Sequence, residues 1–135
     1  MKTSIKRIQE FVTMSSAYLK ENKEETKLKY AINKVRARTT KCFQQYYEQK
    51  EDIEIDLANV DEKGSVLFTV NAKGVREYQF TKEGVKELNK QLKELFTEDR
   101  FEIESHICNE LPEDIQGEYL NYFDGFVCIN NKSEE

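Results

Sequence analysis

The stretch EETKLKYAINKVRARTTKCFQQYYEQKEDIEIDLAN, residues 24–59, decides the fold that this sequence predicts. Side chains suited to one side of a helix recur in it every three or four positions: Leu28, Ile32, Val35, Thr39, Cys42, Tyr46, Gln49, Ile53, Leu57 and then Val60. This spacing is close to 3.5 residues, which is typical of two helices packed side by side. No glycine or proline interrupts it before Gly64. We therefore predict a helix from Glu24 to at least Lys50.

The end of this long helix has two interpretations. Ile53, Ile55 and Leu57 alternate with acidic residues, as they would in a strand. The same residues also continue the helical seam in phase. A seam that continues over many residues is stronger than alternation over five, so we favour a helix that reaches as far as Asn59.

Helical periodicity and turn residues predict the other elements. A first amphipathic helix covers residues 4–20, with Thr3 or Ser4 as its cap, and a polar break at 21–25 follows it. The later elements are a β-hairpin of residues 65–70 and 75–80, a third helix capped by Thr81, a half-buried strand at 101–107, a short helix from Pro112 to about Asp124, and a short strand at 126–129.

These elements predict a single α+β domain over residues 1–135. A helical hairpin, residues 4–58, is followed by a compact α+β half, residues 61–129, and a frayed tail, residues 130–135. The length of 135 residues is enough to bury a hydrophobic core without disulfides or metals. Fifteen aromatic residues, eight Phe and seven Tyr, argue against disorder.

The sequence predicts a cytoplasmic protein with free thiols. It contains no signal-peptide pattern and no run near the roughly 18 apolar residues that a membrane-spanning helix needs. Its three cysteines, Cys42, Cys108 and Cys128, are far apart and form no CxxC pair. That usage indicates neither a disulfide framework nor a zinc site.

Charge divides the sequence into two parts. Residues 1–50 carry 12 Lys or Arg against 5 Glu, a net charge of +7, whereas residues 51–135 carry 9 against 21 acidic residues, a net charge of −12. Such a division is typical of a basic face for nucleic acid or an acidic partner. It is equally typical of two parts of one fold that attract each other, which is the interpretation we favour.

No pattern of catalytic residues stands out, and we predict that the protein is not an enzyme. Neither GxxxxGK[ST] nor GxGxxG occurs, so no phosphate-binding loop is predicted. The only histidine, His106, would share a strand face with Cys108, opposite Ile103 and Ile107. The spacing supplies no further metal ligand or base, so the sequence predicts no catalytic residue, metal or cofactor.

Basic residues gather on the second helix, where no acidic residue occurs between Thr26 and Tyr47. They form a stripe beside the apolar seam, close to two tyrosines. The resulting candidate residues for binding a macromolecule are Lys27, Lys34, Arg36, Arg38, Lys41, Tyr46 and Tyr47. Such a stripe can neutralise phosphates, but the isoelectric point of about 5.1 is low for a dedicated DNA-binding domain.

The order of features over residues 3–115 resembles that of small proteins of unknown function encoded by tailed bacteriophages and prophages. The segments that carry this resemblance follow the first helix: ETKLKYAINKVRARTTK, VDEKGSVLFTVNAKGVREYQFT, GVKELNKQLKELF, and FEIESHI followed by LPEDI. The resemblance implies a non-enzymatic accessory role, either as a virion or assembly component or as an inhibitor that docks on a host factor. It would place the protein in the cytoplasm of the host cell.

A protein partner is therefore the leading expectation. The seam of the second helix is longer than the first helix can cover by about two turns, and either the α+β half or a partner must cover the surplus. A homo-oligomer formed through this helix is one such arrangement. Nucleic-acid binding through the basic stripe is the alternative.

Overall fold

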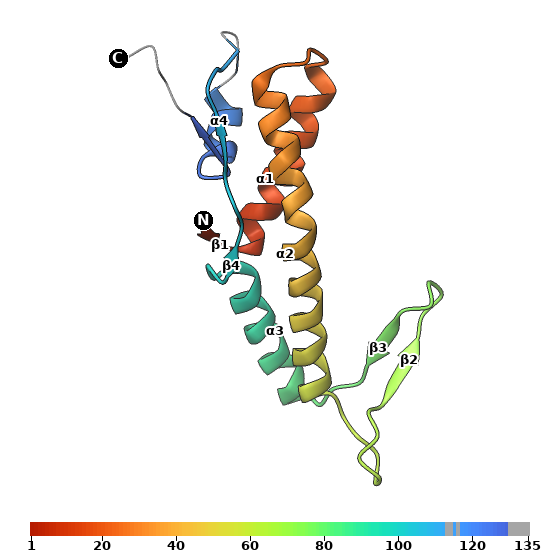
Figure 1. Ribbon diagram of the computed structural model, residues 1–135. Helices are drawn as coiled ribbons and strands as arrows, with labels where there is room; N and C mark the ends of the chain where they lie inside the picture. Colours follow the sequence, from red (N-terminus) through yellow and green to blue (C-terminus); the bar gives the residue numbers. More distant parts are fainter. Residues whose placement is uncertain (113–114, 116, 130–135) are drawn as a thin grey trace. The chain divides into compact units, whose positions relative to one another are not determined.

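The computed structural model describes residues 1–112, 115 and 117–129. The described elements, in chain order, are β1 (Lys2–Thr3), α1 (Ile5–Glu21), α2 (Lys27–Leu57), β2 (Phe68–Val70), β3 (Arg76–Tyr78), α3 (Lys82–Thr97), β4 (Phe101–Glu102), β5 (His106–Cys108), α4 (Gly117–Phe123) and β6 (Val127–Ile129) (Figure 1). The α+β class and the long second helix are confirmed. Parts of the predicted fourth helix, at residues 113, 114 and 116, and the predicted tail, 130–135, lie outside the described residues.

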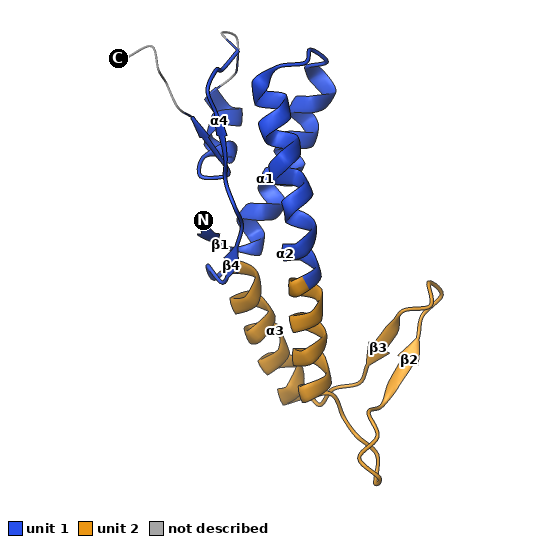
Figure 2. Cartoon of the chain, in the orientation of Figure 1, with its two compact units in different colours: residues 1–44, 98–135 blue, residues 45–97 orange. Residues whose placement is uncertain are grey.

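The chain divides into two compact units (Figure 2). Unit 1 contains residues 1–44 and the described residues from 98 onward, and unit 2 contains residues 45–97. The boundary falls inside α2, which is helical without a break to Leu57. The helical interpretation of residues 53–57 is therefore confirmed.

The core of unit 1 forms along α1 and the first part of α2, which run side by side (Figure 2). Ser4 is the N-cap of α1, because its hydroxyl accepts a hydrogen bond from the backbone N–H of Arg7 at 3.2 Å. The buried residues of the two helices recur at helical spacing: Ile5, Ile8, Phe11, Ser15 and Tyr18 on α1, and Leu28, Ala31, Ile32, Val35, Thr39 and Cys42 on α2. The seam predicted from sequence is therefore the buried side of α2 as far as Cys42.

Aromatic side chains pack α4 and the turn after it against α1. The ring of Phe11 stacks on that of Phe126, with centroids 4.6 Å apart, and meets that of Phe123 edge-on at 5.8 Å. Tyr119 packs edge-on against Tyr18, and its hydroxyl donates a hydrogen bond to the Glu21 carboxylate at 2.7 Å. This bond is the main reason why the pKa of the Tyr119 phenol is raised.

The strands of the described residues form three separate pairs. β1 pairs antiparallel with β4, with Thr3 opposite Phe101, and β2 pairs antiparallel with β3, with Phe68 opposite Tyr78. β5 and β6 run parallel, and Ile107 lies opposite Cys128. The predicted hairpin and the last strand are thus present, each shorter than predicted.

The single strand predicted for residues 101–107 is wrong in one respect, because it is two strands with a break between them. Phe101 and Ile103 are buried as predicted, but Ile107 is 62 % exposed while Cys108 is buried. The alternation therefore shifts by one residue between Ile103 and Ile107.

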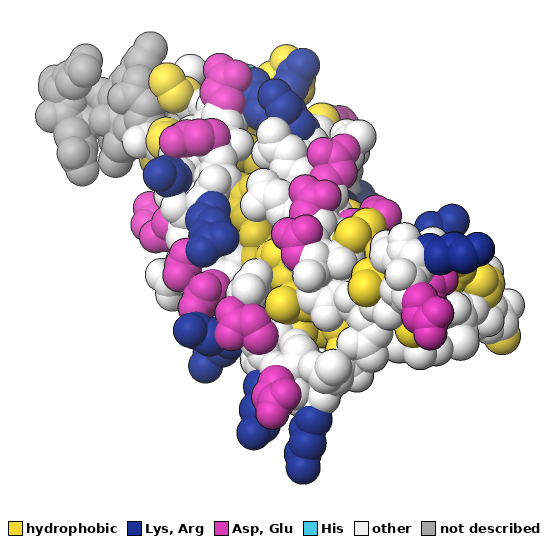
Figure 3. Space-filling model, turned by 90° about the horizontal axis from the view of Figure 1, so that it is seen from below, with side chains coloured by type: hydrophobic (Ala, Val, Ile, Leu, Met, Phe, Trp, Pro, Cys, Tyr) yellow, Lys and Arg dark blue, Asp and Glu magenta, His cyan; other side chains and the backbone are white. Residues whose placement is uncertain are grey.

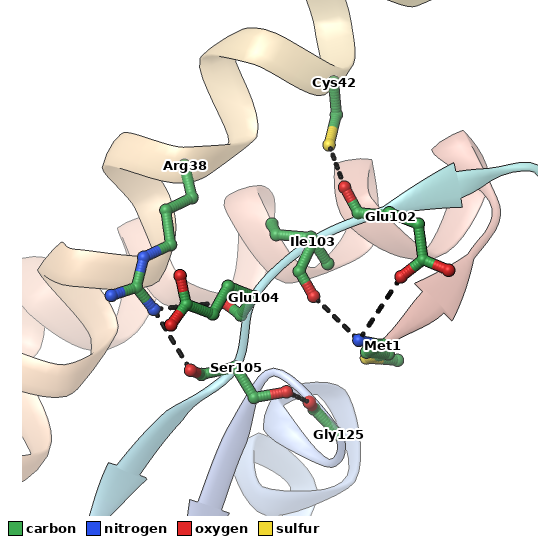
Figure 4. A network of polar contacts seen from close by, with 8 residues as sticks. All are labelled: Met1, Arg38, Cys42, Glu102, Ile103, Glu104, Ser105 and Gly125. Atoms are coloured by element: carbon green, nitrogen blue, oxygen red, sulfur yellow. Dashed lines mark hydrogen bonds and ion pairs between the residues drawn. The ribbon is translucent and has the colours of Figure 1, made fainter.

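Side chains produce this shift, as Figure 4 shows. The Ser105 hydroxyl donates to the carbonyl of Gly125 at 2.6 Å, and the Arg38 guanidinium donates to the carbonyls of Glu104 and Ser105 at 3.1 Å each. These bonds hold the backbone at Glu104 and Ser105, after the last backbone hydrogen bonds to the N-terminal segment, which Ile103 exchanges with Met1 at 2.9 Å each.

Unit 2 consists of the end of α2, the β2–β3 hairpin and α3. The end of α2 and α3 lie side by side (Figure 2), and a Cβ atom at Gly84 would lie 3.7 Å from the carbonyl oxygen of Leu57. The hairpin turn is closed by the Asn71 side chain, which accepts from the N–H groups of Lys73 and Val75 at 2.9 and 3.1 Å. Gly74 adopts the positive φ of 79° that this turn requires.

We expect Phe11→Ala to lower the free energy of unfolding by about 3–5 kcal/mol, because it leaves a cavity beside the rings of Phe123 and Phe126. Urea denaturation followed by circular dichroism measures this loss. Ile107→Ala, which truncates an exposed side chain of the same unit, should change stability by less than about 0.5 kcal/mol. Equal losses in the two variants would contradict the packing described for Phe11.

Candidate functional site

Two arginines of the predicted basic stripe bind groups of the protein itself. The Arg36 guanidinium donates to the carbonyl of Val12 at 3.0 Å and to the hydroxyls of Ser15 and Ser16 at 2.6 and 2.8 Å, and so ties α2 to α1. Arg38 holds the carbonyls at the break between β4 and β5. Both side chains therefore have structural partners that a ligand would have to displace.

The lysines of the stripe lie nearer to solvent. Lys27 forms an ion pair with Glu110 at 3.3 Å, and both side chains are more than 60 % exposed, so the pair contributes little to stability. The Lys34 ammonium lies 5.2 Å from the ring centroid of Tyr30. Lys41 is exposed. Lys34 and Lys41 are thus the lysines of the stripe whose exposed charge suits a binding surface.

The two predicted tyrosines belong to unit 2, whereas the basic residues belong to unit 1. The rings of Tyr46 and Tyr47 lie against each other with centroids 5.4 Å apart. Tyr46 is half-buried, while Tyr47 is 62 % exposed. The predicted set is therefore spread over both units.

We expect Arg36→Met to lower the free energy of unfolding by about 1–3 kcal/mol, because three hydrogen bonds to α1 are lost while the aliphatic part of the side chain is kept. Thermal unfolding monitored by circular dichroism measures the change. Lys34→Met removes the same charge from the same helix and should change stability by less than about 0.5 kcal/mol. If both variants are as stable as the parent, the hydrogen bonds of Arg36 do not contribute to the free energy of unfolding.

His106, Cys42 and Cys108 each have a partner within the chain. The His106 ring packs edge-on against Tyr30, with centroids 5.6 Å apart, and the Cys108 thiol donates to the carbonyl of Glu110 at 3.0 Å. The Cys42 thiol donates to the Glu102 carbonyl at 3.4 Å, and burial raises its pKa against a smaller opposing effect of Lys41. Within the described residues, no three His, Cys, Asp or Glu side chains lie close enough to hold a metal ion.

Alkylation should distinguish the three thiols. Cys128 is exposed, whereas Cys42 and Cys108 are buried, so iodoacetamide at pH 8 should modify Cys128 at least about tenfold faster than the other two. Mass spectrometry of proteolytic peptides over time gives the three rates. Fast modification of Cys42 in the folded protein would contradict its burial.

A different surface emerges in unit 2, on one face of the β2–β3 hairpin. The register places Phe68 opposite Tyr78 and Val70 opposite Arg76, so these four side chains share a face. The Arg76 guanidinium lies 4.5 Å from the centroid of the Phe68 ring, which it partly covers. Phe68 is nevertheless 40 % exposed and Val70 59 % exposed.

Beside this face lies an open groove of about 320 Å³, which we call the hairpin groove. Its lining comes from two elements of unit 2: Tyr47, Lys50, Glu51 and Glu54 of α2, and Val75, Arg76 and Tyr78 at the third strand. The α2 residues are three or four positions apart and so share one side of the helix. Tyr47 is the one predicted candidate residue that lines the groove.

The surface around the groove combines apolar and acidic groups. Residues 45–57 carry five acidic side chains against Lys50, a net charge of −4. In the space-filling view, hydrophobic side chains are exposed among acidic and basic ones (Figure 3). This combination suits a protein segment with apolar and basic side chains. The alternation of Val66, Phe68, Val70, Tyr78 and Phe80 is the sequence signal that could have indicated it.

Comparison with known proteins adds no assignment. No protein-family model matches the chain, and no curated protein or solved structure shows significant similarity to it. None of the described helices is both long and apolar enough to cross a membrane.

Proposed function

We propose that this chain is a non-enzymatic accessory protein of the phage or mobile-element type, which acts by binding another protein through unit 2. One observation carries the proposal. Of the hydrophobic residues at positions 45–97, all of which the structure describes, Leu95 alone is fully buried. The exposed large hydrophobic residues of this unit include Tyr47, Ile55, Val60, Phe68, Val70, Val75 and Val85.

Exposed apolar side chains of this number favour docking. Covering them removes apolar area from water, with a gain of about 25 cal/mol per Å². A two-stranded hairpin with exposed apolar side chains is also marginally stable by itself, so a partner that covers these side chains would stabilise it. The partner we propose presents apolar and basic side chains to the hairpin groove.

The resemblance of the element order to small phage proteins supports the biological setting. In that setting the protein is either a virion or assembly component or an inhibitor of a host factor, and it acts in the host cytoplasm. The partner decides between these roles, since an assembly component binds a phage protein and an inhibitor binds a host protein.

Nucleic-acid binding is the second candidate, and the exposed Lys34 and Lys41 favour it. The internal bonds of Arg36 and Arg38 count against it, because they reduce the number of free cations on the stripe. Retention on DNA or RNA at low salt that is abolished by Lys34→Glu with Lys41→Glu would support this alternative.

The test of the main proposal is affinity purification of the tagged full-length protein from its native host, with and without nuclease, followed by mass spectrometry. We expect a defined protein partner that survives nuclease. Tyr47→Glu with Val75→Glu, which places two charges in the hairpin groove, should lower recovery of that partner at least about tenfold. Ile107→Glu, which adds a charge at an equally exposed apolar residue of unit 1, should not.

Two outcomes would overturn the proposal. One is a partner that is lost on nuclease treatment, which would move the function to nucleic acid. The other is a protein partner retained equally by the groove variant and the Ile107→Glu control, which would move the docking surface out of unit 2.

A further inference from the structure

The outer edge of β2 has free backbone groups. The N–H of Gln79 donates to the carbonyl of Leu67 at 3.1 Å, and the N–H of Asn71 donates to the carbonyl of Val75 at 2.9 Å. The carbonyl of Leu67 and the N–H of Asn71 thus point to the side of the strand on which β3 lies, and the N–H of Leu67 donates to the carbonyl of Asn59 at 2.8 Å. Because the direction of the backbone groups alternates along an antiparallel strand, Phe68 and Val70 direct theirs to the opposite side.

Nothing in unit 2 pairs with this edge at Phe68 or Val70. Among the described residues, β2 has β3 as its only strand partner, and the neighbouring bridge between Val60 and Val66 ends before β2 begins. All residues of unit 2 are described, so within this unit the edge is open over the length of the strand. An open edge of this kind is a template for another strand.

The two edges of the hairpin differ in charge. Residues 65–70, SVLFTV, carry no charged side chain, whereas β3 carries Arg76 and Glu77. Charged residues on an edge strand normally prevent pairing between copies. The hairpin is protected in this way at β3 and left unprotected at β2.

We propose that β2 is a self-association edge, which pairs antiparallel with β2 of a second copy about a two-fold axis at Thr69. Phe68 of each copy then lies opposite Val70 of the other, and their free N–H and C=O groups form four backbone hydrogen bonds. The two hairpins become one four-stranded sheet. One of its faces carries Phe68, Val70, Tyr78 and Arg76 from both copies.

The absence of charged side chains on β2 favours a second copy of the chain as the partner at this edge. A two-fold axis places the residue on the axis opposite its own copy, so a neutral residue at that position avoids repulsion between like charges. At β2 the residue on the axis is the neutral Thr69, whereas the same operation centred on β3 would place Glu77 against Glu77. The homo-oligomer that we propose uses β2, whereas the expectation from sequence placed it on the second helix.

The dimer should be weak. The pairing involves three residues of each copy. The surface area that it buries is well below that of a stable interface, so we expect a dissociation constant on the order of 100 µM. It uses the edge of β2 and leaves the hairpin groove open. This inference therefore does not rest on the proposed protein partner, and self-association is measured on the purified chain alone.

The test is sedimentation equilibrium of the full-length protein from about 10 µM to about 1 mM, a range that brackets this constant. Amide hydrogen exchange by NMR is measured at both ends of the range. We expect a monomer–dimer equilibrium, and slower exchange of the Phe68 and Val70 amides at the high concentration. The amide of Thr69, which faces β3, should exchange equally at both.

Thr69→Lys is the decisive variant. It places two ammonium groups together at the axis and should weaken dimerisation at least about tenfold. The hairpin itself should persist, because the new lysine lies opposite Glu77 of its own chain. Gln79→Lys adds the same charge to the same face of the hairpin, away from the free edge, and should dimerise like the parent.

Three results would overturn the inference. The first is a monomer at every concentration with unchanged exchange at Phe68 and Val70. The second is a dimer that Thr69→Lys leaves intact, which would place the interface elsewhere. The third is protection of these two amides only in complex with a foreign protein, which would assign the edge to a strand of that partner.

Discussion

The buried side of α2 is the constraint on which unit 1 depends. Leu28, Ile32 and Val35 are fully buried, and each such side chain contributes about 1.5–3 kcal/mol when removed from water. Cys42, a small residue of the same seam, has a separate role, because its thiol donates to the carbonyl of Glu102 where the backbone near β4 approaches the helix. The apolar residues therefore supply the stability, and Cys42 links the helix to the strand segment.

The regular elements could be predicted because their signals are local. Ser4 caps the first helix, the seam carries α2 to Leu57, and the hairpin follows from alternating apolar residues. The shift in alternation at Ser105 could not be predicted, since it depends on bonds to Arg38 and Gly125, which are 67 and 20 residues away in sequence. The strand pattern itself contains no trace of those partners.

The candidate site was harder to predict than the fold for a similar reason. A run of basic residues shows where positive charge lies, but not whether each charge is already satisfied. Arg36 and Arg38 have planar guanidinium groups with several donors, which suits them to bind carbonyls and hydroxyls of their own chain. Lys34 and Lys41 on the same helix remain exposed. The two arginines thus have structural roles and the two lysines remain available to a ligand, a difference that follows from the chemistry of the side chains and not from their charge.

The two units differ in how many of their hydrophobic side chains are buried. Residues 45–57 extend a helix that is already formed in residues 27–44, and extending a helix is far easier than nucleating one. Unit 2 can therefore remain ordered with Leu95 as its only fully buried hydrophobic residue, although a core of that size would not stabilise an independent domain. Because order in this unit does not require its apolar side chains to be buried, Tyr47, Phe68 and Val70 stay available at the surface. The long α2 is what allows one small chain to have both a packed core and an open apolar surface.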